Sequence, residues 1–321
     1  MTWMMWRQHR TEALALTIFI GVIAVALFVL GRPMHALFPL GSAHCLAPPL
    51  DQACRSALVR LQHDYGYSTT VLILLNFAPY AIGGFLGAPL LARELEAGTW
   101  QLVWTQAVPR RRWLAGKVVV LGTLSVLLAA ILSVVIAWYR RPLDLLGGGL
   151  DITGFDLTGT APMAYTLFAF ALGVAAGAVL RRSLPAAAGA LVCFLAVRVT
   201  VAGWIRPHFL TPVTRVEAFV PGSGDIADGT GNVRDMILDQ GFVDADGRRV
   251  SGLGAVIMEG KAREGGGDPA TYLHDHGIQH WVVYQPMDRY WTFQLIESVT
   301  FVGLAALLLA LVFWRIRRPA F

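Results

Sequence analysis

Residues 69–91, TTVLILLNFAPYAIGGFLGAPLL, form an apolar run of membrane-spanning length. A spanning helix needs about 20 mostly apolar residues. Further runs of this kind cover residues 13–30, 114–138, 161–180, 185–204 and 292–314. The chain of 321 residues is 55% hydrophobic and 15% charged, with a mean hydropathy of +0.56. This composition excludes an ordinary soluble domain and predicts an all-α polytopic membrane protein with six transmembrane helices.

The basic residues indicate the orientation of these helices. If both termini are cytoplasmic, the inner segments contain only three acidic residues, Glu12, Glu94 and Glu96. The same segments contain twelve basic residues: Arg7, Arg10, Arg93, Arg110, Arg111, Arg112, Lys117, Arg181, Arg182, Arg315, Arg317 and Arg318. The outer loops 31–68 and 139–160 hold five arginines. The positive-inside rule therefore predicts cytoplasmic N- and C-termini, and the net charge of +5 reflects topology, not nucleic-acid binding.

The spans divide the chain into three predicted regions. Residues 1–204 hold helices one to five, and the first run is too long for a cleavable signal peptide. Residues 205–291 are a small α+β extracytoplasmic insertion, because Asp246-Gly247 suits a hairpin turn and residues 277–284 a strand. Residues 292–321 form helix six and a basic tail.

The outer loops contain three features that we weigh separately. Residues 51–65 suit a helix on the membrane surface, and the glycine-rich loop 139–160 is expected to be flexible and without chemistry. Cys45 and Cys54 share the first outer loop, where a disulfide and two free thiols are both open. Cys193 is expected to be an apolar filler in the fifth span.

Metal binding is the less favoured reading of two outer motifs. Asp244-Ala-Asp246-Gly247 lacks the third ligand position and the distal Glu of a calcium loop and is expected to be a turn. His274, His276 and His280 lack a matching carboxylate or cysteine pattern and are expected to be exposed loop histidines. We therefore predict no metal and no cofactor bound by this chain.

Two charges lie inside the predicted spans, where each is costly. Arg198 precedes Trp204 by six residues, about 9 Å along a helix, and Glu297 follows Thr292 by five, about 8 Å. Because these depths match, we predict an intramembrane ion pair between Arg198 and Glu297. Independent snorkelling of the two side chains to the interface is the alternative. Two G-x-x-x-G pairs, Gly83 with Gly87 and Gly173 with Gly177, favour close helix packing or dimer contacts.

The polar segment 92–117, ARELEAGTWQLVWTQAVPRRRWLAGK, lies between the second and third runs. Its first part, residues 93–104, suits an amphipathic helix that the following residues to Pro109 interrupt. Composition alone indicates an interfacial helix followed by a basic cluster. The chain has no G-x-S-x-G, no H-E-x-x-H and no P-loop, because Gly116-Lys117 is followed by Val118 and lacks the upstream glycine. If ATP drives this protein, another polypeptide binds it.

The order of residues in this segment resembles the E…GT…L…T…P…R…K pattern of type-2 ABC transporter permeases. The residues that carry the resemblance are Glu94, Glu96, Gly98, Thr99, Leu102, Thr105, Pro109, Arg111, Arg112 and Lys117. The resemblance implies that residues 93–112 dock on an ATPase, with Glu94, Glu96, Gly98, Thr99, Trp100, Leu102, Thr105 and Pro109 at the coupling site. Arg110, Arg111, Arg112 and Lys117 are expected to face lipid headgroups or to set topology.

What the resemblance implies is the permease subunit of an exporter, not an enzyme. Its partners would be a homodimer or heterodimer mate, membrane lipids and a separate ABC-type ATP-binding subunit that carries ATP and magnesium. The excess of arginine over lysine suggests a high-GC bacterial genome, and so a bacterial plasma membrane. The main alternative is a non-transporting scaffold or sensor with a ligand-binding outer domain; a membrane-embedded enzyme is third.

Overall fold

The computed structural model describes residues 2–46, 51–96, 110–147, 149–151, 153–219, 235–250, 260 and 269–316. Within these described ranges, six helical stretches are long and apolar enough to cross a membrane: Arg10–Ala36, Ser68–Glu94, Arg111–Arg140, Ala161–Leu180, Ser183–His208 and Met287–Arg315. Each stretch contains or overlaps one of the six apolar runs. The prediction of a mostly helical protein with six candidate spans is confirmed.

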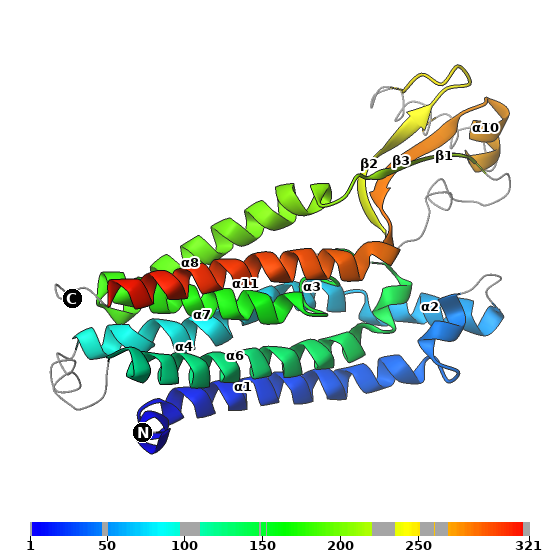
Figure 1. Ribbon diagram of the computed structural model, residues 1–321. Coiled ribbons are helices and arrows are strands. Elements are labelled where there is room, and N and C mark those ends of the chain that lie inside the picture. The colour runs from blue at the N-terminus through cyan, green and yellow to red at the C-terminus, as the bar shows by residue number, and fades with distance from the viewer. Residues whose placement is uncertain are drawn as a thin grey trace. The chain divides into compact units, whose positions relative to one another are not determined.

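The element order follows the chain closely (Figure 1). The helices are α1 (Thr2–Ala36), α2 (Gln52–Tyr65), α3 (Ser68–Leu74), α4 (Ala78–Glu96), α6 (Arg110–Arg140), α7 (Ala161–Leu180), α8 (Ser183–Thr200), α10 (Pro269–Asp275) and α11 (Tyr290–Arg315). The short turns are η1 (Ser42–Leu46), η2 (Leu75–Phe77), η3 (Leu143–Leu145), η4 (Val201–Ile205), η5 (Arg206–His208) and η6 (Met287–Arg289). The strands are β1 (Val213–Ala218), β2 (Met236–Val243) and β3 (Gln279–Gln285).

The chain divides into two compact units. The first, the helical unit, comprises Met1–Leu146, Ile152–Arg206 and Trp291–Phe321. The second, the sheet unit, comprises Gly147–Asp151 and Pro207–Tyr290.

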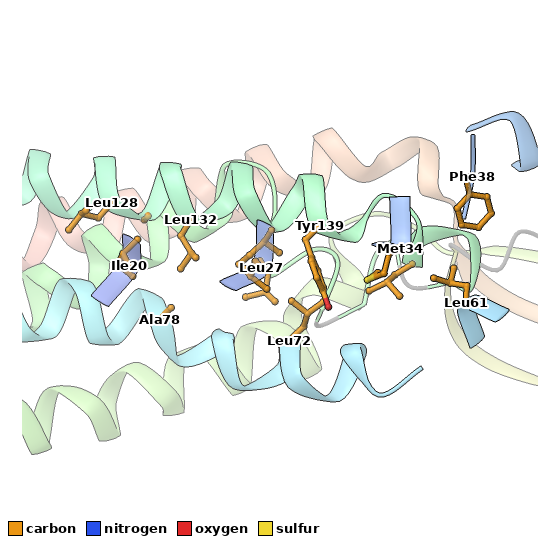
Figure 2. Packing of buried hydrophobic residues seen from close by; sticks show 14 of the residues in the cluster. Ile20, Leu27, Met34, Phe38, Leu61, Leu72, Ala78, Leu128, Leu132 and Tyr139 are labelled. Atoms are coloured by element: carbon orange, nitrogen blue, oxygen red, sulfur yellow. The ribbon is translucent and has the colours of Figure 1, made fainter. Parts of the chain in front are cut away.

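One core of the helical unit packs α1 against α6 and the neighbouring helices (Figure 2). The α1 residues Ile20, Leu27 and Met34 recur every seventh position, which is a spacing that keeps them on one face. The same cluster includes Leu128 and Leu132 of α6. Near the C-terminal end of α6, the Tyr139 hydroxyl donates a hydrogen bond to Ser68 Oγ at 3.1 Å.

The two G-x-x-x-G pairs face each other across α4 and α7. A Cβ atom placed on Gly173 would lie 2.6 Å from the Ala88 nitrogen, and one on Gly177 would lie 2.8 Å from the Ala88 oxygen. A Cβ on Gly87 would likewise overlap the Phe170 backbone. The two backbones therefore touch, and these glycines serve packing within the chain.

The predicted helix at residues 51–65 and the disulfide between Cys45 and Cys54 are both present. α2 begins after Asp51, whose side chain accepts a hydrogen bond from the Cys54 amide at 2.6 Å, an N-terminal cap. Cys45 and Cys54 form a disulfide with their Cα atoms 5.6 Å apart. Cys193 is a free cysteine and is exposed on the surface of α8.

The sheet unit contains a three-stranded antiparallel sheet in the order β1-β3-β2. β3 confirms the strand expected near residues 277–284. The turn at Asp246-Gly247 is present, with φ of +76° at Gly247, and the Asp244 carboxylate accepts the amides of Asp246 and Arg248 as a turn should. The residues after the turn pair back on the end of β2 through the Val243–Arg249 bridge, and the Val250 amide donates to the Phe242 carbonyl at 2.8 Å, so the expected small hairpin is present.

The three histidines of the sheet unit, His274, His276 and His280, do not converge. His274 and His276 are exposed, whereas His280 is buried among the rings of Phe219 and Phe242. Burial lowers the pKa of His280 because desolvation disfavours its charged form. Among the described residues no group of three or more potential ligands is suitable for a metal ion.

Candidate functional site

The last turn of α4 carries three charged residues that reach three other helices. Arg93 pairs with Glu12 of α1. Glu94 pairs with Lys117 of α6, with Oε1 and Nζ 2.5 Å apart. Glu96 accepts hydrogen bonds from the Ser183 amide at 3.2 Å and hydroxyl at 3.0 Å, at the start of α8. We call these six residues the α4 clamp.

The Glu94–Lys117 pair is the buried member of the clamp. Glu94 is 7% exposed and Lys117 is 1% exposed, and the Lys117 ammonium lies 4.4 Å from the centre of the Trp113 ring. Two assignments are therefore corrected: Lys117 does not face lipid headgroups, and Glu94 points into the helical unit instead of toward a partner. A buried ammonium needs a carboxylate, and Glu94 of α4 supplies one.

Glu96 is exposed and accepts the hydrogen bonds described above at the first residue of α8. Hydrogen bonds from the Ser183 amide and hydroxyl, helped by nearby Arg182 and Arg93, lower the pKa of Glu96. A carboxylate at a helix N-terminus is also favoured by the helix dipole. Glu96 thus ties the end of α4 to the tight turn between α7 and α8, where Arg181 adopts a φ of +56°.

The other predicted coupling residues lie outside the described residues: Gly98, Thr99, Trp100, Leu102, Thr105 and Pro109. The described chain stops at Glu96 and resumes at Arg110, so the clamp holds the chain on both sides of the segment 97–109. Arg111 and Arg112, at the start of α6, are exposed, which agrees with a boundary position.

A second polar site lies inside the helical unit and joins a loop to three helical segments. Arg206 of η5 donates to Glu297 of α11 from Nε at 2.8 Å and from Nη2 at 2.9 Å, and it also pairs with Asp156 of the loop before α7. The Tyr165 hydroxyl of α7 donates to Glu297 at 2.5 Å. Arg206, Asp156, Tyr165 and Glu297 are all at most 2% exposed. Together with Arg198 we call them the ionic cluster.

Arg198 has partners other than the one predicted. Its Nη2 lies 3.1 Å from Asp156 Oδ2 and 3.4 Å from Asn76 Oδ1, and its guanidinium lies 3.7 Å from the centre of the Tyr165 ring. The predicted direct pair between Arg198 and Glu297 is therefore wrong. Both residues belong to one cluster, but Arg198 pairs with Asp156 and Glu297 pairs with Arg206.

Sequence reasoning missed three members, Asp156, Tyr165 and Arg206. Span five seemed to end at Trp204, but a π-helical turn, Val201–Ile205, and a 3-10 turn carry it on to His208 and keep Arg206 inside. Asp156 belongs to the loop 139–160, which we expected to have no chemistry. The available signal was that Asp156 lies between Phe155 and Leu157, because two large apolar residues are unusual in a flexible, solvent-exposed loop.

Six candidate spans with mutually neutralised internal charges define a polytopic helical membrane protein. The chain belongs to the ABC-2 membrane transporter related family, whose model matches residues 17–206, more than half of its length. The match includes both partners of the Glu94–Lys117 pair and ends at Arg206. Family membership indicates an ABC-type permease. No curated protein and no solved structure matches the chain.

Proposed function

We propose that this chain is the membrane-spanning permease subunit of an ATP-driven ABC exporter in a bacterial plasma membrane. It would form the translocation path as a dimer with itself or with a similar permease. ATP and magnesium would bind a separate ATP-binding subunit, and catalysis of ATP hydrolysis would belong to that subunit. Family membership and the lack of a P-loop in the sequence support this division of labour.

The orientation in this proposal has both termini in the cytoplasm. It rests on the distribution of basic residues, twelve of which then lie on the inner side. In this orientation the α4 clamp is at the cytoplasmic membrane boundary and the ionic cluster is toward the outer side. The segment 97–109 then faces the compartment that contains ATP.

The observation that carries the proposal is the clamp around segment 97–109. Glu94 and Glu96 precede the segment, and Lys117 follows it by about two helical turns. A push on the segment would therefore be transmitted to α1, α6 and α8 together through Glu12, Lys117 and Ser183. ATP binding can drive such a shift only if the ATP-binding subunit contacts the two states of the permease differently.

The test is co-purification of the full-length chain with an ATP-binding subunit, followed by vanadate-sensitive ATP hydrolysis. Leu102→Glu in the segment is expected to abolish co-purification, since it replaces an apolar residue of the predicted coupling site with a charge. Val59→Glu is the matched control, because Val59 is an exposed apolar residue of α2 outside the segment. Equal capture of the ATP-binding subunit by all three chains would contradict the coupling role of 97–109. Failure to find any ATP-binding partner would refute the permease.

A ligand-sensing scaffold is the second candidate, because the sheet unit has a core of its own. Phe219, Phe242, Leu273 and Ile278 form that core. Replacing residues 212–286 with a flexible linker separates the two functions. A permease is expected to keep the ATPase activity of its partner subunit in this deletion, whereas a sensor would lose its output.

A further inference from the structure

The segment 153–160 connects the helices α6 and α7 but does not lie on the surface as connecting segments usually do. Thr153, Phe155, Asp156 and Leu157 are all buried in the helical unit. A buried connection needs partners for its backbone groups, because unsatisfied amides and carbonyls are costly.

One side chain, Gln294 of α11, supplies several of these partners. Its Nε2 donates to the carbonyls of Phe155 at 2.9 Å and Thr158 at 3.1 Å. Its Oε1 accepts the amides of Thr160 at 2.9 Å and Ala161 at 2.8 Å. Thr160 and Ser298, one turn further along α11, share a hydroxyl hydrogen bond of 2.9 Å. The segment is therefore attached to α11 by side-chain contacts that can be exchanged for water.

Asp156 attaches the same segment to α8 and its extension. Its two carboxylate oxygens are divided between Arg198 and Arg206. Arg206 also pairs with Glu297, whereas Asp156 is the one carboxylate paired with Arg198 in the part of the chain that the structure describes. Arg198 Nη1 is buried and has no hydrogen-bond partner there. Release of Asp156 would thus leave Arg206 neutralised and Arg198 uncompensated.

The helix that presents the two arginines is irregular between them. Residues eight apart on a regular α-helix lie ~80° apart around the axis. The π-helical turn Val201–Ile205 winds less per residue and so reduces this offset, which helps Arg198 and Arg206 reach the same carboxylate. Asn76, the remaining partner of Arg198, lies in η2, where the second span is also irregular. The fifth span, which carries Arg198, and the second span, which carries Asn76, are therefore both irregular near this contact.

We infer that residues 153–160 form a gate, that the structure shows it closed, and that Asp156 is its latch on Arg198 and Arg206. The inference rests on the proposed function for what passes the gate, which is the exported substrate leaving toward the outer side. In the open state the segment leaves α7, α8 and α11, and water replaces its contacts with Gln294. The ion pair between Arg206 and Glu297 is kept in the open state.

The first test measures access to the segment in the full-length chain. A Leu157→Cys reporter, in a Cys193→Ala background, is labelled with a water-soluble maleimide in membrane vesicles; Leu157 is 2% exposed. Asp156→Asn is expected to raise the labelling rate at least tenfold. Asp144→Asn is the matched control, because Asp144 pairs with buried Arg140 at 3.1 Å outside the segment, and it should leave the rate unchanged.

A second reporter separates opening of the gate from loosening of the whole helical unit. Leu128→Cys lies in the core between α1 and α6. Slow labelling of Leu128→Cys in the Asp156→Asn chain supports a local latch. Parallel rises at both positions, or no rise at Leu157→Cys, would overturn the gate.

The third test uses a reversible lock in the complex with the ATP-binding subunit. Thr160→Cys with Ser298→Cys replaces two hydroxyls that are in contact, so a disulfide can form between the segment and α11. ATP is expected to speed the labelling of Leu157→Cys. Oxidation of the two cysteines to a disulfide should cancel this effect, and reduction of the disulfide should restore it. A chain without the pair, treated identically, controls for the Cys45–Cys54 disulfide. If a complex that hydrolyses ATP shows no effect of ATP on the labelling of Leu157→Cys, the gate proposal is wrong. If no such complex exists, the proposed permease function is wrong, and the labelling of the Asp156→Asn chain still tests whether Asp156 holds the segment closed.

Discussion

The α4 clamp and the ionic cluster solve the problem of charge in a membrane protein in different ways. The clamp uses separate pairs that range from the buried Glu94–Lys117 to the exposed Glu96. The cluster shares two guanidinium groups and two carboxylates among residues that are almost fully buried. Water can take part in the clamp, so its members can act singly, whereas in the cluster every charge depends on another side chain.

This difference suggests different roles. Separate contacts from one helical turn to three helices are suited to passing on a displacement. A shared network is suited to switching between two arrangements, because the loss of one member disturbs all the others. Four predictions test the contrast, from the largest effect to the smallest.

Removing Arg206 is expected to have the largest effect on stability. Arg206→Leu leaves Asp156 and Glu297 buried with too few cations, which costs about 3–5 kcal/mol for a broken buried pair. The free energy of unfolding in mixed detergent micelles measures it. Arg206→Lys keeps the charge but loses the bidentate contact with Glu297, so its free energy of unfolding should lie between those of the wild type and Arg206→Leu. A wild-type value for Arg206→Leu would show that the cluster is not a network.

Lys117→Leu is expected to cost about 3 kcal/mol, at the lower end of the range for a broken buried pair, because Glu94 lies near the membrane boundary. The Glu94→Leu/Lys117→Leu double variant should recover most of this loss, since no charge then remains buried. The same unfolding measurement applies. No recovery in the double variant would mean that the clamp is a network like the cluster, and the contrast would be lost.

Gly87→Ala tests the seam between α4 and α7 that joins the two sites. The added methyl group overlaps the Phe170 backbone and is expected to cost about 1–3 kcal/mol through overpacking. Gly21→Ala in α1 is the matched control, because nothing lies within 4 Å of the added atom, and it should be neutral or slightly stabilising. Equal stabilities for both variants would contradict the close contact.

Glu96→Gln is expected to have the smallest effect, because Glu96 is exposed. Global stability should not change measurably, but hydrogen exchange at the Ser183 amide should become faster. The pKa of Glu96 is lowered in the folded protein, so its contribution is present above the usual glutamate pKa of about 4.3 and is lost as the pH falls through its lower folded value. Peptide-level exchange at pH 7 and at pH 3–4, corrected for intrinsic rates, measures this. Unchanged exchange in Glu96→Gln would remove the exposed member from the clamp.

The number and approximate bounds of the spans were predictable, because apolar length alone identifies a spanning helix. The strand near Gln279–Gln285, the Gly247 turn and the helix α2 were also predictable from local residue chemistry. The pairing of Arg198 was not, since equal depth along two helices does not show which faces meet. The same reason explains why Glu94 and Lys117 were not recognised as a pair: they are distant in sequence, and only the packing of α4 on α6 brings them together.

The sequence by itself determined that this is a six-span membrane protein whose polar segment 92–117 resembles a coupling element, because hydropathy, charge asymmetry and residue order are properties of the linear chain. The tertiary structure decided which charges neutralise one another. In the folded chain the loop residue Asp156 is buried beside Arg206, and a π-helical turn extends the fifth span to include Arg206. Glu94 pairs with Lys117. A buried charge is stable only beside its counter-charge, and that proximity arises from packing.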